Sequence, residues 1–352
     1  MHRFFLPLAR RAGRTVVLAA IVFAAGCSPD STGPEDSADF ARGGSQGPDL
    51  RAATAAKDKH AERLLRQDGI EGVGVTLTGR GTPAVAVFLA HGAVGRVPQE
   101  LDGIPVEPVI TGRIEAILPQ AKPGSGGSTT SRHPRPVPIG ISIGNVGECS
   151  AGTLGARVKS GSNVFILSNN HVMALQNTAA NNSVILQPGR YDTGCATSLG
   201  DEIARLGNYV RISYTGNNTV DAALAPTTTS NVGNGTGTVG YGVPNTQTTA
   251  ATLNMAVQKC GRTTGCTKGV VTAINATVNV QYSGGVARFV NQVVITGRRG
   301  AFSKAGDSGS LIVTDNTSAN PVALLFAGGQ TTTIGNPIGA VLSALNVTID
   351  GK

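Results

Sequence analysis

Most of the chain consists of short apolar runs separated by turn residues, a pattern that is typical of β-structure. After residue 138 the clearest runs are NVFILSNN, GVVTAINATVNVQY, RFVNQVVITG, SLIVTD and PVALLFAGG. The periodicity is weak from Thr227 to Asn254, which indicates long loops. Near the end, NPIGAVLSALNV begins with Asn-Pro and predicts a short helix. We therefore expect an all-β domain at 139–352 with a short C-terminal helix.

A smaller unit is expected before this domain. The segment AATAAKDKHAERLLRQDG has a helical composition and ends at a glycine. Three strand-like runs follow it, IEGVGVTLTG, PAVAVFLA and IPVEPVITGRIEAI. We expect residues 52–118 to form a small α+β unit that serves as an accessory or pro-region. Residues 119–138 are rich in Pro, Gly and Ser and predict a linker that proteases can cut.

The first residues have the pattern of an export signal. A basic segment precedes the apolar run TVVLAAIVFAA, which is too short to span a bilayer, and AAGC follows. AAGC resembles a bacterial lipobox, so we expect a signal peptide at 1–26 and lipid attachment at Cys27; ordinary cleavage with a free Cys27 thiol is the alternative. Residues 27–51 predict a flexible tether. The expected product is an exported lipoprotein anchored in the cell envelope, or a form released from it.

Composition and charge narrow the expected partners. Charged residues make up 14% of the chain and aromatic residues 4%, while 48 residues are glycine, as expected for many short strands and tight turns. The formal net charge is +8, but four of the arginines lie in the signal segment and would leave with it. No run of basic residues with interleaved aromatics occurs, so we expect no nucleic-acid partner.

Four cysteines follow the signal, Cys149, Cys195, Cys260 and Cys266. An even number in an exported protein predicts two disulfides. Cys260 and Cys266 bracket the natural hairpin loop GRTTG, so among the three possible connectivities we favour Cys260 with Cys266 and Cys149 with Cys195. A zinc site is the alternative, but neither a C-x-x-C motif nor paired histidines supports it, and we expect no metal or other cofactor.

The stretch FSKAGDSGSLIV places Ser308 between an acid and a glycine, directly before an apolar strand. Gly-Asp-Ser-Gly is also common turn chemistry, so this stretch alone does not indicate catalysis. A serine hydroxyl is a poor nucleophile at neutral pH, and a catalytic Ser308 needs a histidine base and a buried acid that orients the base.

The best candidate base is His171, because VFILSNNHVMA delivers it directly from an apolar strand into a turn. The best candidate acid is Asp221 in NTVDAALAP, where the following apolar run carries the carboxylate to the edge of a core. Asp192 and Asp201 lie among polar residues, and we expect them to be solvated. The other histidines lie in the signal, the predicted helix, the small unit and the linker: His2, His60, His91 and His133.

The segments SNNHVMA, VDAALA and AGDSGSLIV occur in the order His, Asp, Ser, with separations of 50 and 87 residues between the three side chains. In order and spacing they resemble the catalytic segments of chymotrypsin-fold (trypsin-like) serine peptidases. The match covers about 139–352, and AGTLGARV, GRTTG and LLFAGG are most similar to bacterial members related to the plant narrow-leaf peptidases. Departures are SNNHV in place of Ala-Ala-His-Cys and Ser310 in place of a second glycine. The resemblance implies a double β-barrel.

The same resemblance implies a serine endopeptidase, a hydrolase that acts on protein or peptide substrates through an acyl-enzyme. Ser308 would be the nucleophile, His171 the general base and Asp221 the residue that orients it. The backbone N–H groups of Gly306 and Ser308 would form the oxyanion hole. The alternative is a catalytically idle member of the fold that acts as a surface binding module.

The resemblance also places the base of the primary substrate pocket near Phe302 and one wall at Phe326 to Gly328. Neither position carries an acid, so we do not expect a preference for Lys or Arg. Asp307 should point inward and needs a buried cation. By resemblance to the GRTTG hairpin of α-lytic-type peptidases that cation is Lys259, with Arg262 as the rival partner and a solvated Lys259 as the alternative.

Overall fold

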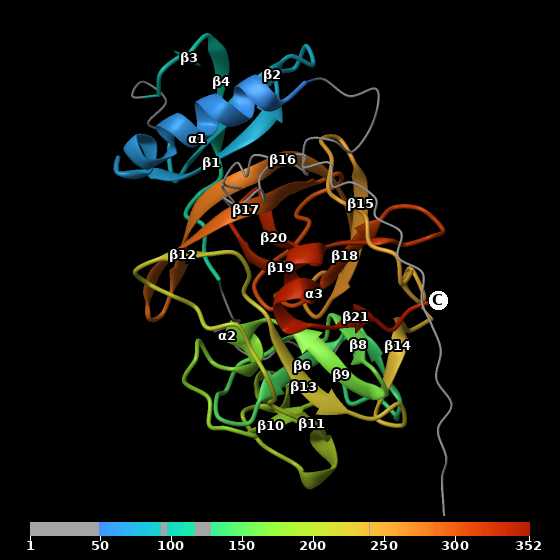
Figure 1. Ribbon diagram of the computed structural model, residues 1–352. Coiled ribbons are helices and arrows are strands. Elements are labelled where there is room, and N and C mark those ends of the chain that lie inside the picture. Colours follow the sequence, from blue (N-terminus) through green and yellow to red (C-terminus); the bar gives the residue numbers. More distant parts are fainter. Residues whose placement is uncertain (1–48, 93–96, 117–127, 239) are drawn as a thin grey trace, which may run out of the picture. The chain divides into compact units, whose positions relative to one another are not determined.

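The structure is a computed structural model that describes residues 49–92, 97–116, 128–238 and 240–352 (Figure 1). The predicted signal peptide, Cys27 and nearly all of the predicted tether lie outside these residues, as does the part of the predicted linker before residue 128. Within the described residues, no helix is long and apolar enough to cross a membrane.

The first half of the β domain contains two four-stranded sheets, with strand orders β11-β10-β6-β7 and β13-β9-β8-β21. Apolar side chains from both sheets, among them Ile143, Ile166 and Ile185, are fully buried in one shared core. A short helix, α2 (Asn170–Met173), directly follows β9. The strands are β6 (Ser142–Asn145), β7 (Gly152–Thr153), β8 (Ala156–Ser160), β9 (Asn163–Ser168), β10 (Val184–Leu186), β11 (Glu202–Arg205), β13 (Ala223–Thr227) and β21 (Thr348–Ile349).

Loops of this half carry two single-turn 3-10 helices at Arg190–Thr193 and Leu199–Asp201. Within the predicted loop region from Thr227 to Asn254, the described residues form one further strand, β14 (Val232–Thr236). It pairs in parallel with β5 (Val137–Ile139), a strand that begins inside the predicted linker.

The second half closes into a barrel. Its strands follow the order β17-β20-β19-β18-β15-β16, and β16 pairs back with β17, so the six strands form a ring. The strands are β15 (Ala256–Gly261), β16 (Gly265–Tyr282), β17 (Gly285–Gly297), β18 (Leu311–Thr314), β19 (Pro321–Gly328) and β20 (Thr333–Pro337). The two-residue strand β12 (Asn217–Asn218) joins β17, and helix α3 (Ile338–Leu345) follows β20. The predicted all-β fold, a double β-barrel with a short C-terminal helix, is confirmed.

The N-terminal segment has the predicted helix and strands: α1 (Arg51–Leu65), β1 (Ile70–Leu77), β2 (Pro83–Leu89), β3 (Glu100–Leu101) and β4 (Ile104–Ile110). Alanine and leucine side chains on one face of α1 pack against valines of β1 and β2 and form a core of their own. Strand β1 also pairs antiparallel with β16, with Val73 opposite Thr277. One continuous sheet therefore joins these strands to the second barrel, and whether residues 52–118 act as a separate domain stays a prediction.

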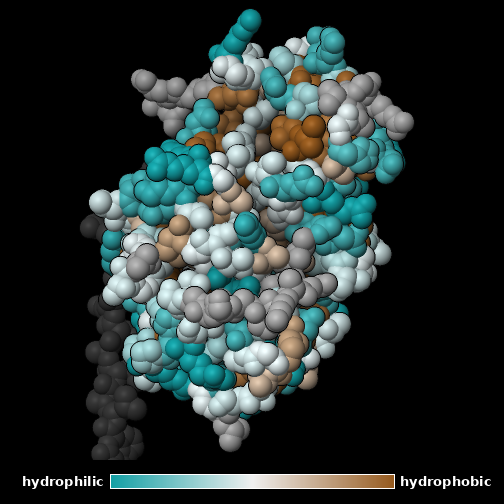
Figure 2. Space-filling model, turned by 180° about the vertical axis from the view of Figure 1, so that it is seen from behind, coloured by the Kyte–Doolittle hydropathy of each residue, from teal (hydrophilic) through white to brown (hydrophobic). Residues whose placement is uncertain are grey.

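The surface is mostly polar or neutral on the face shown in Figure 2. Hydrophobic side chains gather there at the end of the molecule that carries α1 and β1 to β4 in Figure 1. Among the described residues, the large hydrophobic side chains with high exposure are Ile110, at the end of β4, and Val286, at the start of β17.

Candidate active site

His171 lies in α2, one turn after β9 delivers the chain from the first core. Two buried asparagines hold this turn: Asn169 donates its amide to the carbonyl of Asp221 (2.7 Å), and Asn170 donates to the carbonyl of Val210 (2.7 Å). The unusual SNNH sequence therefore has a structural role, since both amides satisfy backbone carbonyls that the loops bring inward. The His171 side chain is only 1% exposed.

The carboxylate of Asp221 is fully buried and accepts three hydrogen bonds. Its Oδ2 accepts from His171 Nδ1 (2.6 Å) and from the hydroxyl of Tyr282 (2.8 Å), and its Oδ1 accepts from the backbone N–H of His171 (3.2 Å). Because the carboxylate is an acceptor, the neutral imidazole carries its proton on Nδ1 and leaves Nε2 as an acceptor. Nε2 is buried and has no hydrogen-bond partner among the described residues.

Ser308 lies in the turn before β18, with 4% of its surface exposed. Its Oγ donates to the carbonyl of Phe326 at 3.5 Å and makes no hydrogen bond to His171 among the described contacts. The structure thus brings His171 and Asp221 together directly, whereas Ser308 bonds to a carbonyl. Catalytic hydrogen bonds are often loose in the absence of substrate and tighten in the reactive complex.

The backbone before Ser308 is held in a conformation that requires glycine. Gly306 has a φ of 95°, and a Cβ atom there would lie 2.5 Å from Thr263 Oγ1. Thr153 binds the carbonyls on both sides, since its hydroxyl donates to Gly306 (2.9 Å) and its N–H to Ser308 (2.8 Å). Neither Gly306 nor Ser308 donates its own N–H to another described residue. Both N–H groups are therefore available to a ligand.

Asp307 and Lys259 are both fully buried, and their charged atoms lie 3.4 Å apart. The turn that contains GRTTG surrounds the Asp307 carboxylate. The carboxylate accepts hydrogen bonds from the backbone N–H groups of Thr263 (2.8 Å) and Thr264 (3.1 Å) and from the Thr264 hydroxyl (2.7 Å). The N–H of Lys304 donates as well (2.9 Å). Burial lowers the pKa of the Lys259 ammonium, and the charge of Asp307 opposes this shift.

The rival cation, Arg262, pairs with Asp192 instead, and its guanidinium donates to both oxygens of that carboxylate. The side chain of Asp192 is only 2% exposed. Asp201 is also buried and accepts two hydrogen bonds from Arg132 (2.6 and 2.8 Å). The expectation that both acids are solvated is wrong, because each carboxylate is buried with an arginine that lies far away in the sequence.

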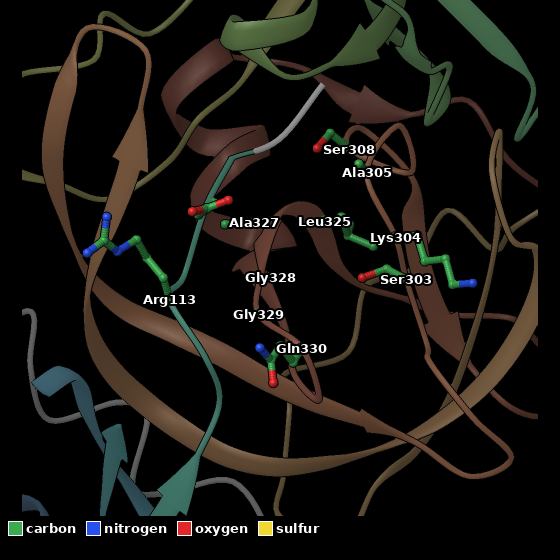
Figure 3. Close-up of a pocket in the computed structure, with 11 residues that line it drawn as sticks. Arg113, Ser303, Lys304, Ala305, Ser308, Leu325, Ala327, Gly328, Gly329 and Gln330 are labelled. Carbon is green, nitrogen blue, oxygen red and sulfur yellow. The ribbon is translucent and has the colours of Figure 1, made fainter. Parts of the chain in front are cut away.

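A cavity of about 310 Å³ lies beside Ser308 (Figure 3). Its lining comes from residues 303–305 and Ser308, from residues 325 and 327–330 at the end of β19, and from Arg113 and Glu115. Figure 3 shows Arg113 on one side of the cavity and Ser303 and Lys304 on the other.

Of the expected pocket residues, Gly328 lines the cavity, whereas Phe302 and Phe326 are buried and do not line it. Alternation along β19 explains the position of Phe326: residues 325 and 327 face the cavity, so the side chain between them faces the barrel core. Its ring packs against Phe289, with centroids 4.6 Å apart. Phe302 packs in the second apolar core of the same barrel.

The backbone around Glu115 forms a connection to the cavity that the sequence did not predict. Glu115 exchanges two backbone hydrogen bonds with Gly328, its N–H donating at 2.9 Å and its carbonyl accepting at 3.0 Å. On its other side the segment pairs with Gln281, which accepts from the N–H of Ala116 (3.1 Å) and donates to the carbonyl of Ile114 (2.9 Å). Nothing in IPVEPVITGRIEAI distinguishes this pairing from an ordinary strand in the small unit.

The four cysteines form the two pairs favoured from the sequence, Cys149 with Cys195 and Cys260 with Cys266. The second pair closes the hairpin that wraps Asp307. Among the described residues there is no group of three or more His, Cys, Asp or Glu side chains that could hold a metal ion.

Comparison with known proteins gives a family match over part of the chain. Residues 216–336 match the family of the Nal1 C-terminal domain, a range that includes Asp221 and Ser308 but not His171. No curated protein matches the chain at the level required for a significant relationship.

Several solved structures resemble part of the chain. One is a glutamic acid-specific serine protease (24% identity, TM-score 0.43), which covers 60% of this chain and 100% of its own. Another is protease A of Thermobifida fusca (17%, 0.44), covering 61% of this chain and 99% of its own. A third is the chymotrypsin of Cellulomonas bogoriensis (19%, 0.43), with the same coverage of 61% and 99%.

Proposed function

We propose that the chain is a serine endopeptidase that hydrolyses peptide bonds through an acyl-enzyme. The observation that carries this proposal is the buried hydrogen bond between His171 Nδ1 and Asp221 Oδ2, which leaves Nε2 free as a base. A histidine with a purely structural role rarely donates one nitrogen to a buried carboxylate and leaves the other nitrogen buried without a partner, because an unsatisfied buried acceptor costs free energy.

In the proposed mechanism, Ser308 Oγ rotates from the Phe326 carbonyl to Nε2 of His171 and attacks the substrate carbonyl carbon. The imidazole takes the hydroxyl proton and then gives it to the leaving amine, while Asp221 stabilises the charged ring. The available N–H groups of Gly306 and Ser308 bind the oxyanion that develops on the substrate. Water then releases the acyl group by the same steps in reverse.

The ion pair of Lys259 with Asp307 supports the oxyanion hole in this account. It lies within the turn that holds Gly306 and does not depend on a new chain terminus. The proposed enzyme therefore needs no cleavage near Ile139 to form its oxyanion hole. Activity of the protein with an intact chain at this point is the corresponding expectation.

The cavity bears on substrate preference. Leu325 and Ala327 give it apolar walls, and its charged lining residues are two basic side chains, Arg113 and Lys304, and one acid, Glu115. A basic substrate side chain would meet more like charge than opposite charge there, which favours small or medium apolar side chains over Lys and Arg.

Export and anchoring are proposed on sequence grounds. The two disulfides are consistent with an oxidising compartment. In this proposal Cys27 carries a lipid, 27–51 is the tether, and 139–352 is the peptidase domain, with 52–118 as an accessory or pro-region. Detergent partitioning of wild type and Cys27→Ala checks the anchor, since equal partitioning into the aqueous phase contradicts it.

The experiment that tests the function is labelling with a fluorophosphonate probe, followed by cleavage of a peptide library. Labelling that disappears in Ser308→Ala, together with cleavage of internal peptide bonds, is the expected result. A folded protein that takes up no probe would be an idle member of the fold, and hydrolysis of short-chain esters without peptide cleavage would indicate an esterase.

A further inference from the structure

The hydroxyl of Tyr282 has a place in the candidate site that the mechanism above does not use. Tyr282 is the last residue of β16, and its side chain is buried. The hydroxyl donates to Asp221 Oδ2 at 2.8 Å, the same oxygen that accepts from His171 Nδ1 at 2.6 Å. One carboxylate oxygen therefore receives two donors, one of which is the candidate base.

The surroundings hold this hydroxyl in place. The Tyr282 ring meets the His171 ring edge to face, with centroids 5.9 Å apart, and packs against Phe289 at 6.1 Å. Among the described residues, the ring of another titratable side chain, Tyr214, lies with its centroid 6.3 Å from that of Tyr282. Burial, with the charge of Asp221, raises the pKa of Tyr282 well above its ordinary value, so the hydroxyl keeps its proton and stays a donor.

We propose that Tyr282 is a positioning residue, which fixes the carboxylate of Asp221 so that Oδ2 faces the imidazole. This inference rests on the proposed function. The other oxygen, Oδ1, accepts from the backbone N–H of His171, so among the described contacts Tyr282 is the one donor to the carboxylate that does not come from His171 itself. Without it, the carboxylate is anchored only to the residue that it has to position. The same bond withdraws negative charge from Oδ2 and so limits how strongly Asp221 stabilises the protonated ring.

The variant Tyr282→Phe tests this proposal because it keeps the ring and deletes only the hydroxyl. We expect kcat to fall by about tenfold with KM unchanged, as for a lost hydrogen bond to a charged group. We also expect the acidic limb of the kcat/KM profile to move to higher pH, since Oδ2 regains negative charge when it loses the Tyr282 donor and then favours the protonated base. Unchanged kcat and an unchanged profile would overturn the proposal.

Tyr214→Phe is the matched control. Its hydroxyl donates to Gln176 Oε1 (3.2 Å) and not to Asp221, while its ring packs against the ring of Tyr282. The pH profile of this variant should therefore stay as in wild type. A second readout does not depend on turnover: in Ser308→Ala, the NMR signal of the His171 Nδ1 proton should shift when Tyr282→Phe is added. An unshifted signal contradicts the positioning role, whereas failure of fluorophosphonate labelling in wild type contradicts the proposed function.

A second inference comes from a different observation, the backbone pairing of Glu115 with Gly328. The two residues exchange both of their hydrogen bonds, as in a regular antiparallel ladder. Gly328 is two residues beyond Phe326, whose carbonyl contacts Ser308 Oγ, so the ladder lies about 7 Å along β19 from that contact. An extended peptide with its carbonyl at Ser308 and its chain antiparallel to β19 would use the same edge.

This segment is paired on both of its sides. Its other side pairs with Gln281, the residue before Tyr282, and its side chains Arg113 and Glu115 line the cavity together with Ser308. We infer that residues 111–116 are an intramolecular occupant of the peptide-binding edge, so an extended substrate must displace them. This inference also rests on the proposed function.

Two probes separate the outcomes. A small fluorophosphonate needs only Ser308, whereas a tetrapeptide chloromethyl ketone also needs the β19 edge. Glu115→Pro removes the N–H that binds Gly328, and Glu115→Ala keeps it, so the difference between them isolates the backbone pairing. We expect the peptide probe to react about fivefold or more faster with the proline variant than with the alanine variant, and the small probe equally fast with both.

Equal peptide-probe rates in the two variants would overturn the inference. If Glu115→Pro does not fold, Ala116→Pro gives the second test, because it removes the hydrogen bond to Gln281 and leaves the N–H of Glu115 in place. No reaction of wild type with either probe would contradict the proposed function instead.

Discussion

The two halves of the candidate site are built by different means. The first barrel supplies a hydrogen-bonded side-chain pair, His171 and Asp221. The Asp221 carboxylate also accepts from the Tyr282 hydroxyl, whereas Nε2 of His171 has no partner among the described residues. The second barrel supplies a backbone conformation, the turn at Gly306 and Ser308, which the buried ion pair of Lys259 and Asp307 stabilises. Substitutions in the first half should therefore change proton transfer, and substitutions in the second should change geometry and stability.

The largest effect is expected for Asp221→Asn. The amide would donate to Nδ1, so the ring would carry its proton on Nε2 and could not accept one from Ser308. We expect turnover to fall by about 10⁴-fold with little change in the free energy of unfolding, as when the acid of an established Ser-His-Asp triad is replaced by its amide. Steady-state kinetics with thermal unfolding checks this, and a loss below tenfold would contradict the orienting role.

The second half is tested by Lys259→Met, which leaves Asp307 buried without its cation. We expect a loss of about 3 to 5 kcal/mol in the free energy of unfolding, because an uncompensated buried charge is costly. Turnover should fall by about a hundredfold, because the N–H of Gly306 would no longer point at the position of the oxyanion.

Lys268→Met is the matched control for this prediction. Lys268 lies on the neighbouring strand and pairs with Asp315, but its side chain is 61% exposed. Chemical denaturation should show a change below about 1 kcal/mol, as is usual for an exposed pair. Equal losses in the two lysine variants would show that the buried pair has no special role.

The smallest effect on activity is expected for Asp201→Asn, which removes the charge of a buried carboxylate that lies outside the candidate site. Its partner Arg132 is 56% exposed, so the pair is partly screened by solvent and the loss of stability should stay near 1 kcal/mol. Turnover should remain within about twofold of wild type. A large loss of turnover would break the distinction between the site and the rest of the first barrel.

Three acids, Asp221, Asp192 and Asp201, show how far the sequence could predict the site and its surroundings. Asp221 could be found because an apolar run follows it and because its order with His171 and Ser308 resembles a known arrangement. Asp192 and Asp201 were expected to be solvated, since neighbouring residues in the sequence are polar. Their burial depends on arginines 70 and 69 residues away, which local composition does not reveal.

Most of the fold was predictable, because the patterns that specify it are local in the sequence. Strand and turn patterns are local, and the all-β class, the C-terminal helix and the helix of the small unit follow from them. Tyr282 and the Glu115 ladder were not predictable, because each is a contact between distant segments that a barrel brings together. In a strand, a tyrosine that binds a carboxylate has the same pattern as one that fills a core.

The central claim is that Ser308 is a nucleophile activated by His171, and active-site labelling tests it most directly. Purified protein is treated with a fluorophosphonate probe, and the modified residue is located by mass spectrometry in wild type, Ser308→Ala and His171→Ala. We predict labelling on Ser308 in wild type, none in Ser308→Ala, and a rate at least about a thousandfold lower in His171→Ala. Folded wild-type protein that stays unlabelled, or labelling that is equally fast without His171, would contradict this account.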